Sequence, residues 1–552
     1  MKNVTHLSMS IALICILSHC IINTQDDLFI EDTHVDNFLH STWLDQVQFQ
    51  TTRSKATPED IASLLIDIGA LSLLQANIYR KTNPMNVRNV LDYPIHIPIK
   101  YSPASWITNI TLFYNHTNRN FFTRTSDAIS SYLGVCDPKL LEFLSNDVLE
   151  EVIRNELPNF NLDPLDVMPL FKNMTIQERR IGIMFHGMKR FPNNARFRFM
   201  FPVLYVENNF WLTEDEQRAV EARFGKDPNK DAFADEFLIS DKVGVGDLRL
   251  SYDTPIIDKS FFHLRAGVYA TIPVSFAFKR GLKGSYFKKR EQQKPFDFVA
   301  LFCNAQGTPA EKQAATQEGI DFFTNAIKHL SANVIERPLG NNGHLGLGAY
   351  IRYKSYARTF IKRRWAENVT FNSHIAFEIL TPAQHRRFYI EKSDQSEFEA
   401  LGLDQDIDTI KERIENSPAY AQQVLTFFSV QMTEKFFPFA LKSSIWPGCI
   451  FKWTSKAHYE GERWGVEAGL DTWVQAREKI YNISIPSTVP QDLNIAIARR
   501  PFGYQWKLFG SIFLKNKHNE DNWLVSISSD YTIAHTGIGG DYTIALVFER
   551  HF

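Results

Sequence analysis

Three glycine pairs have the spacing that opens a dinucleotide-binding loop: Gly244 and Gly246, Gly346 and Gly348, and Gly537 and Gly539. Such a loop needs a third glycine three residues later and a helix after it, because the helix N-terminus holds the pyrophosphate. The third positions are Arg249, Ile351 and Tyr542, and each pair lies in a strand pattern. The glycines therefore indicate small residues on a strand face, where another group packs closely.

The adjacent Ser373 and His374 come nearest to a nucleophile with its base. Neighbouring side chains of a strand point to opposite faces, so this pair cannot touch. The 16 histidines are scattered without metal-ligand spacing, and the sequence has neither a Walker loop nor a His-Glu-x-x-His motif. We therefore expect no enzyme, no metal and no cofactor, although a Ser/His/Asp site built from distant strands stays open.

The composition excludes several classes of protein. The 552 residues include 60 Lys and Arg against 62 Asp and Glu, so the net charge is −2 and gives no reason to expect nucleic acid. A hydrophobic share of 44% rules out a disordered chain, and a mean hydropathy of −0.24 argues against a bundle of transmembrane helices. The unusual feature is the aromatic share of 13%, with 44 Phe.

The first 25 residues read as a secretory signal peptide. Lys2 precedes an apolar run from Leu7 to Leu17, which is too short to span a bilayer and is followed by polar residues. Once it is removed, three widely spaced cysteines remain, which predict neither a disulfide framework nor a zinc site. We expect an exported protein.

From about residue 92 to the C-terminus, apolar residues alternate with polar or small ones. The clearest segment is 262–278, in which Phe262, Leu264 and Val268 alternate with His263 and Arg265. Period two is the signature of β-strands with one apolar and one polar face. Thirteen such segments occur, with a fourteenth at 493–499.

Several of these segments have ten or more residues, whereas strands of soluble proteins are usually 5–6 residues long and membrane strands need about 9–11. Aromatic residues lie at the ends of the apolar faces, as membrane interfaces require. They are Tyr93, Tyr101, Trp106, Tyr114, Trp464, Tyr504, Trp506, Trp523 and Tyr542. The pattern favours a membrane barrel over its alternative, a large soluble β-sandwich or lipocalin-like barrel.

On these residues the chain resembles bacterial outer-membrane β-barrel proteins of the porin or outer-membrane-transporter type, with no particular family indicated. Such proteins end in an amphipathic strand with a terminal Phe that the barrel-assembly machinery is understood to read. Here Ile544, Phe548 and Phe552 match in phase, while Arg550 departs from the pattern. The resemblance implies an all-β fold, namely a transmembrane antiparallel up-and-down β-barrel of about 14 strands (12–16), in the bacterial outer membrane.

Three departures from a simple porin set the expected organisation. An apolar helix over 58–74 predicts a lumen plug or rim segment within residues 26–90, ahead of a barrel over 91–552. Helical patterns predict insertions near 137–157, 308–335 and 394–437. Prolines also interrupt strand patterns, where each removes a ladder donor. They are Pro94, Pro98, Pro202, Pro273 and Pro447.

The polar strand faces give the candidate lumen-lining residues. The basic ones are Lys100, Arg196, Arg198, Arg249, Arg265, Arg352, Lys354, Lys507 and Lys515. The acidic ones are Asp247, Glu378, Glu467, Asp471 and Asp530, and His263 and His374 lie on the same face. The excess of bases predicts a mild preference for anions. The alternative is that these charges pair across neighbouring strands and only support the lumen.

The sequence thus predicts a pore or channel in the outer membrane for small hydrophilic or amphipathic solutes. A second hypothesis is a non-conducting surface anchor whose helical loops bind a host or envelope partner. A third is a eukaryotic secreted glycoprotein, because six Asn-x-Ser/Thr sites occur. The expected partners are the lipid bilayer, small solutes and the assembly machinery, without nucleic acid. The solute, the openness of the lumen and the oligomeric state are left open.

Overall fold

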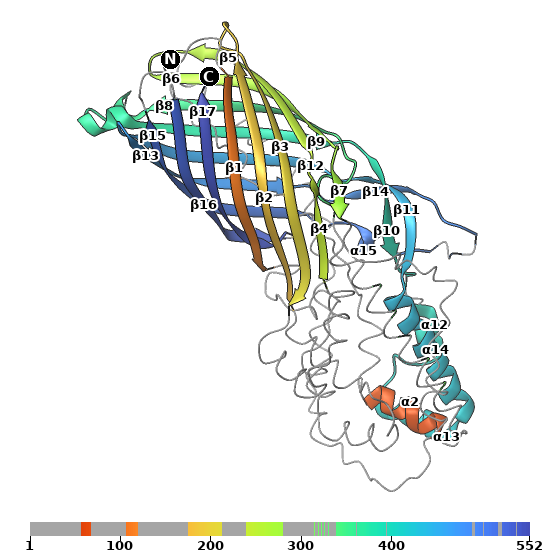
Figure 1. The fold of residues 1–552 in the computed structure, drawn as a ribbon. Helices are drawn as coiled ribbons and strands as arrows, with labels where there is room; N and C mark the ends of the chain where they lie inside the picture. Colours follow the sequence, from red (N-terminus) through yellow and green to blue (C-terminus); the bar gives the residue numbers. More distant parts are fainter. Residues whose placement is uncertain are drawn as a thin grey trace, which may run out of the picture. The chain divides into compact units, whose positions relative to one another are not determined.

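The alternating segments form strands in the computed structural model of the chain (Figure 1). The structure describes residues 57–67, 106–119, 175–211, 239–279 and 338–551, with five single positions between 314 and 329. Residues 360, 393–394, 488, 490–491, 501, 517–521 and 537 are gaps within these ranges. The predicted signal peptide, the insertion at 137–157, Pro94, Pro98 and Phe552 lie outside the described residues.

Twelve antiparallel strands close into a barrel in which each strand pairs with the next along the chain, and the last pairs with the first. Their bounds are β1 (Trp106–Arg119), β2 (Thr175–Arg190), β3 (Arg196–Trp211), β5 (Leu248–Asp258), β6 (Phe262–Ile272), β8 (Gly346–Tyr356), β9 (Val369–Leu380), β12 (Cys449–Glu460), β13 (Trp464–Gln475), β15 (Gly503–Asn516), β16 (Asn522–Thr536) and β17 (Gly540–His551). The predicted up-and-down topology is confirmed. The closed ring has twelve strands, which is fewer than the expected 14 and lies at the lower limit of the expected range of 12–16.

Two further strands belong to the same sheet but lie outside the ring. β4 (Ile239–Val245) pairs with the second half of β3, and β7 (Phe276–Lys279) pairs with β4. β3 changes partner from β5 to β4 at Pro202, whose carbonyl accepts the Gly246 N–H at 2.9 Å. The N–H that proline lacks would point to this same side, so Pro202 lies where the ladder has no donor to lose.

Two other prolines break segments that the sequence shows as continuous. The pattern over 262–278 ends as a barrel strand at Ile272, because Pro273 makes a turn in which Val274 N–H bonds to the Ile272 carbonyl at 2.9 Å. The pattern over 445–456 is likewise split at Pro447, and Gly448 follows it with a positive φ of 83°. Both prolines lie at ends of barrel strands.

A small second sheet contains β10 (Ala383–Tyr389), β11 (Phe439–Trp446) and β14 (Lys479–Ile483). Its strands follow or precede the barrel strands β9, β12 and β13 along the chain. Tyr389, Leu441 and Ile445 form its apolar core with the short helix α15 (Ile495–Ala498). The strand considered at 493–499 is therefore wrong, because this segment is a helix that covers the sheet.

The connections give the two ends of the barrel different characters. At the end where β1 begins and β17 finishes, the links are short: 191–195, 259–261, 357–368, 461–463 and 517–521. The link 357–368 holds two 3₁₀ turns, Ala357–Thr359 and Arg364–Asn368. At the opposite end the links 120–174, 212–247, 273–345, 381–448 and 476–502 are long, and only 537–539 is short. We call these the short-turn end and the long-loop end.

All three predicted helical insertions lie in links at the long-loop end. In the third, α12 (Gln395–Ala400) and α13 (Ile407–Asn416) precede α14 (Pro418–Phe436), where the Ser417 hydroxyl caps Tyr420 N–H at 3.3 Å. Such a cap satisfies a donor that the first turn leaves free. In the second insertion the described residues 314, 318, 322, 325 and 329 are helical.

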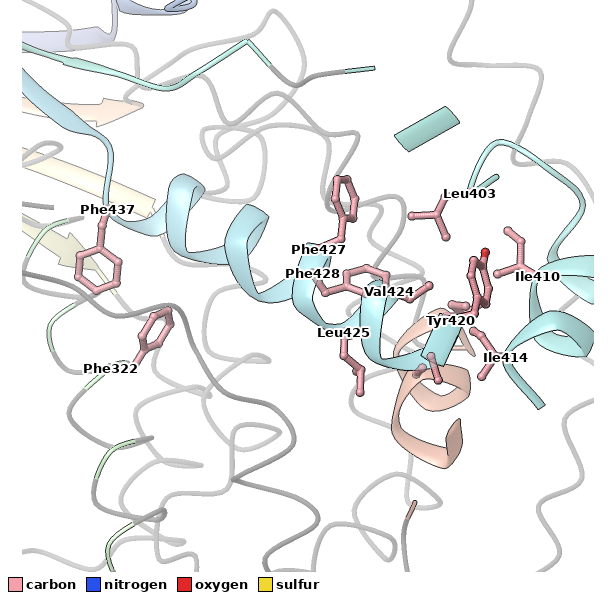
Figure 2. Packing of buried hydrophobic residues seen from close by; sticks show 13 residues of the cluster. Phe322, Leu403, Ile410, Ile414, Tyr420, Val424, Leu425, Phe427, Phe428 and Phe437 are labelled. Carbon is pink, nitrogen blue, oxygen red and sulfur yellow. The ribbon is translucent and has the colours of Figure 1, made fainter. Parts of the chain in front are cut away.

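These helices share an apolar cluster with α2 (Pro58–Asp67), the described part of the helix expected over 58–74. Ala62 and Ile66 of α2 pack with Ile410 and Ile414 of α13 and with the Val424 face of α14 (Figure 2). No helix in the described residues is long and apolar enough to cross a membrane.

Barrel side chains alternate between an apolar exterior and a polar interior. On β6, Val268 is 60% exposed, while Arg265 and Tyr269 on the opposite face are buried. On β1, Ile110 and Leu112 are exposed, while Asn109 and Thr111 are buried. The apolar phase of each segment therefore faces outward, which is the reverse of a soluble barrel with an apolar core.

At the long-loop end, three side chains form a hydrogen-bonded chain with defined proton positions. His344 Nδ1 lies 2.7 Å from the Thr381 carbonyl, so it carries the proton and leaves Nε2 as an acceptor. His385 Nε2 must then donate to His344 Nε2 at 2.7 Å, and His385 Nδ1 accepts from the Asn342 amide at 2.6 Å. Both imidazoles are therefore neutral in the folded chain.

Acidification should loosen this region. Burial lowers the pKa of His385 to about 3, with His344, Arg387 and Arg500 adding to the effect and Glu478 opposing it, and burial also lowers the pKa of His344. The unfolded chain takes up protons near pH 6.5, so stability present above that pH is lost as pH falls toward the folded values. Hydrogen–deuterium exchange of β10 and β11 should accelerate from pH 7.5 to 5.0 after correction for intrinsic rates, and His385→Gln should reduce this dependence. Peptides from β16 are the internal control, and equal pH responses of β10 in both proteins would contradict the prediction.

Candidate functional site

A cavity of about 480 Å³ lies inside the barrel. Its wall is built mainly by the polar-phase residues of ten consecutive barrel strands from β2 to β16, because the alternation of each strand turns one side chain in every two toward the lumen. Arg190, Tyr356 and Glu460 are the last residues of their strands and also line the cavity. The cavity therefore reaches the short-turn end.

The wall of the cavity is strongly basic. Its Lys and Arg residues are Arg190, Arg196, Arg198, Arg249, Arg265, Arg352, Lys354, Lys452, Lys456 and Lys515. Its acidic residues are Asp258, Glu460 and Glu467, and its histidines are His186, His263, His374 and His458. This excess contrasts with the whole-chain charge of −2, so the protein concentrates positive charge at this place.

Asp253 of β5 is the centre of a charge cluster beside the cavity. It is fully buried and lies 3.1 Å from Arg198 Nη2 and 2.5 Å from Arg265 Nε, and it accepts the Tyr350 hydroxyl at 3.0 Å. Arg265 also donates to the Asn194 carbonyl at 2.5 Å. This bond attaches the β2–β3 turn to the cluster, so the charges fix the shape of the cavity at the short-turn end.

Two glycines make room for the tyrosines that reach these acids. A Cβ on Gly267 would lie 2.5 Å from the Tyr350 ring, and one on Gly348 would lie 2.3 Å from the Tyr269 ring. Each tyrosine therefore crosses the neighbouring strand at a glycine, and the Tyr269 hydroxyl donates to Glu378 at 3.2 Å. This is the close packing that the Gly346–Gly348 pair predicted.

Glu378 forms a second cluster on the side of the long-loop end. Arg249 and Lys452 each lie 3.5 Å from its Oε2, and the Thr271 hydroxyl donates to Oε1 at 2.9 Å. A third cluster includes Glu467, which lies 2.6 Å from Lys456 Nζ and 3.4 Å from His458. Lys515 lies 2.5 Å from Glu460. Many lumen charges thus pair across strands, as expected from the alternative hypothesis that these charges support the lumen.

Part of the lumen is filled rather than open. Lys507 of β15 is fully buried and lies 2.9 Å from Asp530 and 2.8 Å from Asp541. Gln505 donates to Asp541 at 2.7 Å and to Thr532 at 3.0 Å. Such a hydrogen-bonded network in a low-dielectric interior rigidifies the wall formed by β15, β16 and β17.

An apolar cluster borders the cavity inside the barrel. Phe113, Met184, Leu204, Val206 and Ala545 form it on β1, β2, β3 and β17. Met200 packs against this cluster and also lines the cavity. The basic cavity is therefore bordered on one side by packed apolar residues.

Ten of the sixteen predicted lumen residues line this cavity: Arg196, Arg198, Arg249, His263, Arg265, Arg352, Lys354, His374, Glu467 and Lys515. Lys100 lies outside the described residues, and the other five do not line the cavity. Glu378, Lys507 and Asp530 are buried in the ion pairs above, and Asp471 accepts the Thr454 hydroxyl at 2.5 Å. Asp247 accepts backbone N–H groups of Asn341 and Ser275 at 2.5 and 3.3 Å, so it holds the turn after β4.

Sequence reasoning missed Asp253, Lys452 and Lys456. Asp253 follows Arg249 and Ser251 on one strand face, but the pattern read over 243–252 stopped one residue short of it. The two lysines lie on the polar phase of 445–456 and could have been found by the same alternation.

No protein-family model and no curated protein matches the chain. Among solved structures, it is similar to an outer membrane channel from Pseudomonas putida F1 (8% identity, TM-score 0.36, covering 82% of this chain and 97% of that one). It is also similar to the toluene transporter TodX of Pseudomonas putida (8%, 0.32, 87% and 96%) and to OmpT, an outer membrane protein of Vibrio cholerae (6%, 0.22, 82% and 99%). TM-scores below 0.5 at these identities establish no common family.

Substituting Gly267 should disturb the Asp253 cluster. In Gly267→Ala the new methyl group meets the Tyr350 ring and the Tyr252 carbonyl at 2.6 Å, so we expect a loss of roughly 1–3 kcal/mol of unfolding free energy. The matched control is Gly510→Ala on β15, where the nearest atom lies at an ordinary 3.5 Å. Urea unfolding followed by tryptophan fluorescence would measure both, and equal midpoints would refute the close packing.

Proposed function

We propose that the protein is an outer-membrane channel for small hydrophilic or amphipathic solutes, with a preference for anions. The observation that carries the proposal is a closed barrel whose exterior is apolar while its interior holds a basic cavity. A closed sheet satisfies every strand edge, which is the condition for placing β-structure in a bilayer. The proposal has a membrane part and a transport part, which are supported separately.

The exterior has the dimensions of a membrane belt. All twelve barrel strands have 11–16 residues, which meets the 9–11 needed to cross at a tilt. On β16 the outward residues run from Trp523 to Ile533, a height of roughly 25 Å at a strand tilt near 40°. Trp106, Trp464 and Trp523 are exposed at the short-turn end, where an interfacial aromatic girdle would lie.

The two ends suggest an orientation. Outer-membrane barrels have short periplasmic turns and longer extracellular loops. We infer that the short-turn end faces the periplasm and that the long-loop end, with α12–α14 and the second sheet, faces outward. The cavity then reaches the periplasmic end of the lumen at the last residues of β2, β8 and β12, and its lining extends to Arg249 and Lys452 toward the long-loop end.

The final strand fits recognition by the barrel-assembly machinery, which we propose as a partner. Ile544 and Phe548 of β17 are exposed on the outer face, and Glu549 is buried on the inner one. Arg550 is also exposed and pairs with Thr108, two residues from the start of β1, where its side chain can extend to the interface. β17 also closes the ring, so its recognition would precede the last pairing step.

The anion preference rests on the cavity. Ten Lys and Arg side chains against three Asp and Glu produce a positive potential, and a low-dielectric wall strengthens it. Acids behind the wall, such as Asp253 and Glu378, neutralise part of this charge. The remaining excess would raise the local concentration of anions and repel cations.

Membrane insertion predicts that a charge is costly on the outer face. Ile527, near the middle of β16, is 62% exposed, so Ile527→Arg should destabilise the barrel folded in a bilayer by roughly 2–4 kcal/mol. Thr359→Arg adds the same charge in an exposed short-turn link and should have little effect. Folding into lipid vesicles, read by heat-modifiable gel migration, would compare them. A soluble barrel would tolerate both substitutions equally.

Channel activity predicts conductance with anion selectivity. In planar bilayers under a salt gradient, the reversal potential should shift toward the chloride equilibrium potential. Lys452→Gln combined with Lys456→Gln should reduce this shift, because both side chains line the cavity. Cation selectivity would refute the anion preference. A correctly folded barrel with no conductance would refute the channel and favour the surface-anchor alternative.

A further inference from the structure

We propose that Arg196, Arg198, Arg352 and Lys354 form a binding site for a multiply charged oxyanion, such as the phosphate group of a small solute. The proposal deepens the channel function and rests on it, because the site is placed on the solute path. It adds a saturable site and a chemical class of ligand to what a general positive potential would give.

The first argument is the charge balance around Asp253. Four arginines approach this single carboxylate: Arg196, Arg198, Arg265 and Arg352. Asp253 has ion pairs with Arg198 and Arg265, and its second oxygen also accepts the Tyr350 hydroxyl. One carboxylate cannot neutralise four guanidinium groups, so the cluster keeps a large positive excess in a partly desolvated place.

The second argument is the strand register. Arg265 on β6 pairs directly with Arg352 on β8, and the next inward pair on the same strands is His263 with Lys354. Like charges opposite one another on a sheet face are destabilising. The barrel therefore accepts a cost at this position, and a bound anion between the two strands and β3 would offset it.

The third argument is a set of hydrogen-bond donors. Arg196 Nε and Arg198 Nη1 are buried, and neither has a hydrogen-bond partner among the described residues. The side chain of Arg198 is about nine-tenths buried and lines the cavity. Buried N–H groups are nearly always bonded, because leaving one without a partner costs its full desolvation. An oxyanion in the cavity would supply the acceptors.

The donors select the ligand class. Guanidinium groups present planar forks that match two oxygens of a phosphate or carboxylate, and Lys354 adds a compact ammonium group from the next inward position of β8. The arginines around Asp253 outnumber this one carboxylate, which favours a ligand group with more than one negative charge. A volume of about 480 Å³ exceeds that of inorganic phosphate and leaves room for a sugar-sized remainder.

Calorimetric titration of the full-length protein in nonionic detergent would test the site. Inorganic phosphate should bind with saturation, and glucose 6-phosphate should bind at least as well, because the remainder of the cavity can hold the sugar. Chloride and unphosphorylated glucose should bind at least tenfold more weakly, since they lack paired charged oxygens. Equal affinity for phosphate and chloride would overturn the proposal.

Substitutions should change the affinity in both directions. Arg196→Gln and Arg352→Gln should each weaken phosphate binding about tenfold, as expected for a lost charge-assisted pair. Arg363→Gln removes the same charge from an exposed position in a short-turn link and should leave the affinity unchanged. Asp253→Asn removes the competing carboxylate and should tighten binding, which a merely structural role of the cluster would not produce.

Heat-modifiable migration shows whether each variant folds, and if Arg196→Gln fails to fold, Arg352→Gln carries the test. Binding in micelles and conductance in bilayers separate the two proposals. A selective conducting barrel without phosphate affinity would overturn the site and leave the channel. Phosphate affinity in a barrel that does not conduct would overturn the channel, and the site would then stand as a binding site only.

Discussion

The pairing of β17 with β1 is the constraint on which the rest of the structure depends. Twelve residue pairs, from Ile107–His551 to Arg119–Gly540, join the first and last strands of the ring. Without them the sheet would have two free edges, and its unpaired backbone groups could not be placed in hydrocarbon. Closure also separates an inside from an outside. The β1–β17 pairing therefore makes one face of every strand line the lumen and the other face the exterior.

Closure explains why the lumen can hold so much charge. In an open sheet the polar face would be solvated, and lysines and arginines there would carry little structural consequence. Inside a ring the same side chains face one another, so they must pair, as Lys507 does with Asp530 and Asp541, or remain in excess, as around Asp253. The filled wall and the basic cavity are two outcomes of one constraint.

The alternation of apolar and polar residues made the barrel predictable from the sequence, because it can be recognised within each strand without knowledge of its partners. Val268 and Arg265 take the faces that their alternation indicates. Strand number was harder, since Pro273 and Pro447 end strands inside patterns that look continuous, and a short apolar stretch at 493–499 cannot be assigned by periodicity alone. The second sheet was missed because β10 and β14 are short, and because a helical segment separates β10 from its partner β11 along the chain.

The candidate site could be predicted only in part, because its residues come together through register. Alternation places Arg265 and Arg352 on inward faces, but their direct opposition depends on a pairing between β6 and β8 across an insertion of more than 70 residues. Nothing local to either strand specifies which residue the partner will present. The Asp253 cluster is therefore a property of the closed ring, and the order of the ring decides which charges share one acid. β6 follows β5 by a short turn, so the position of Arg265 relative to Asp253 is fixed locally. β8 follows a long link, so the position of Arg352 depends on correct pairing within the closed ring.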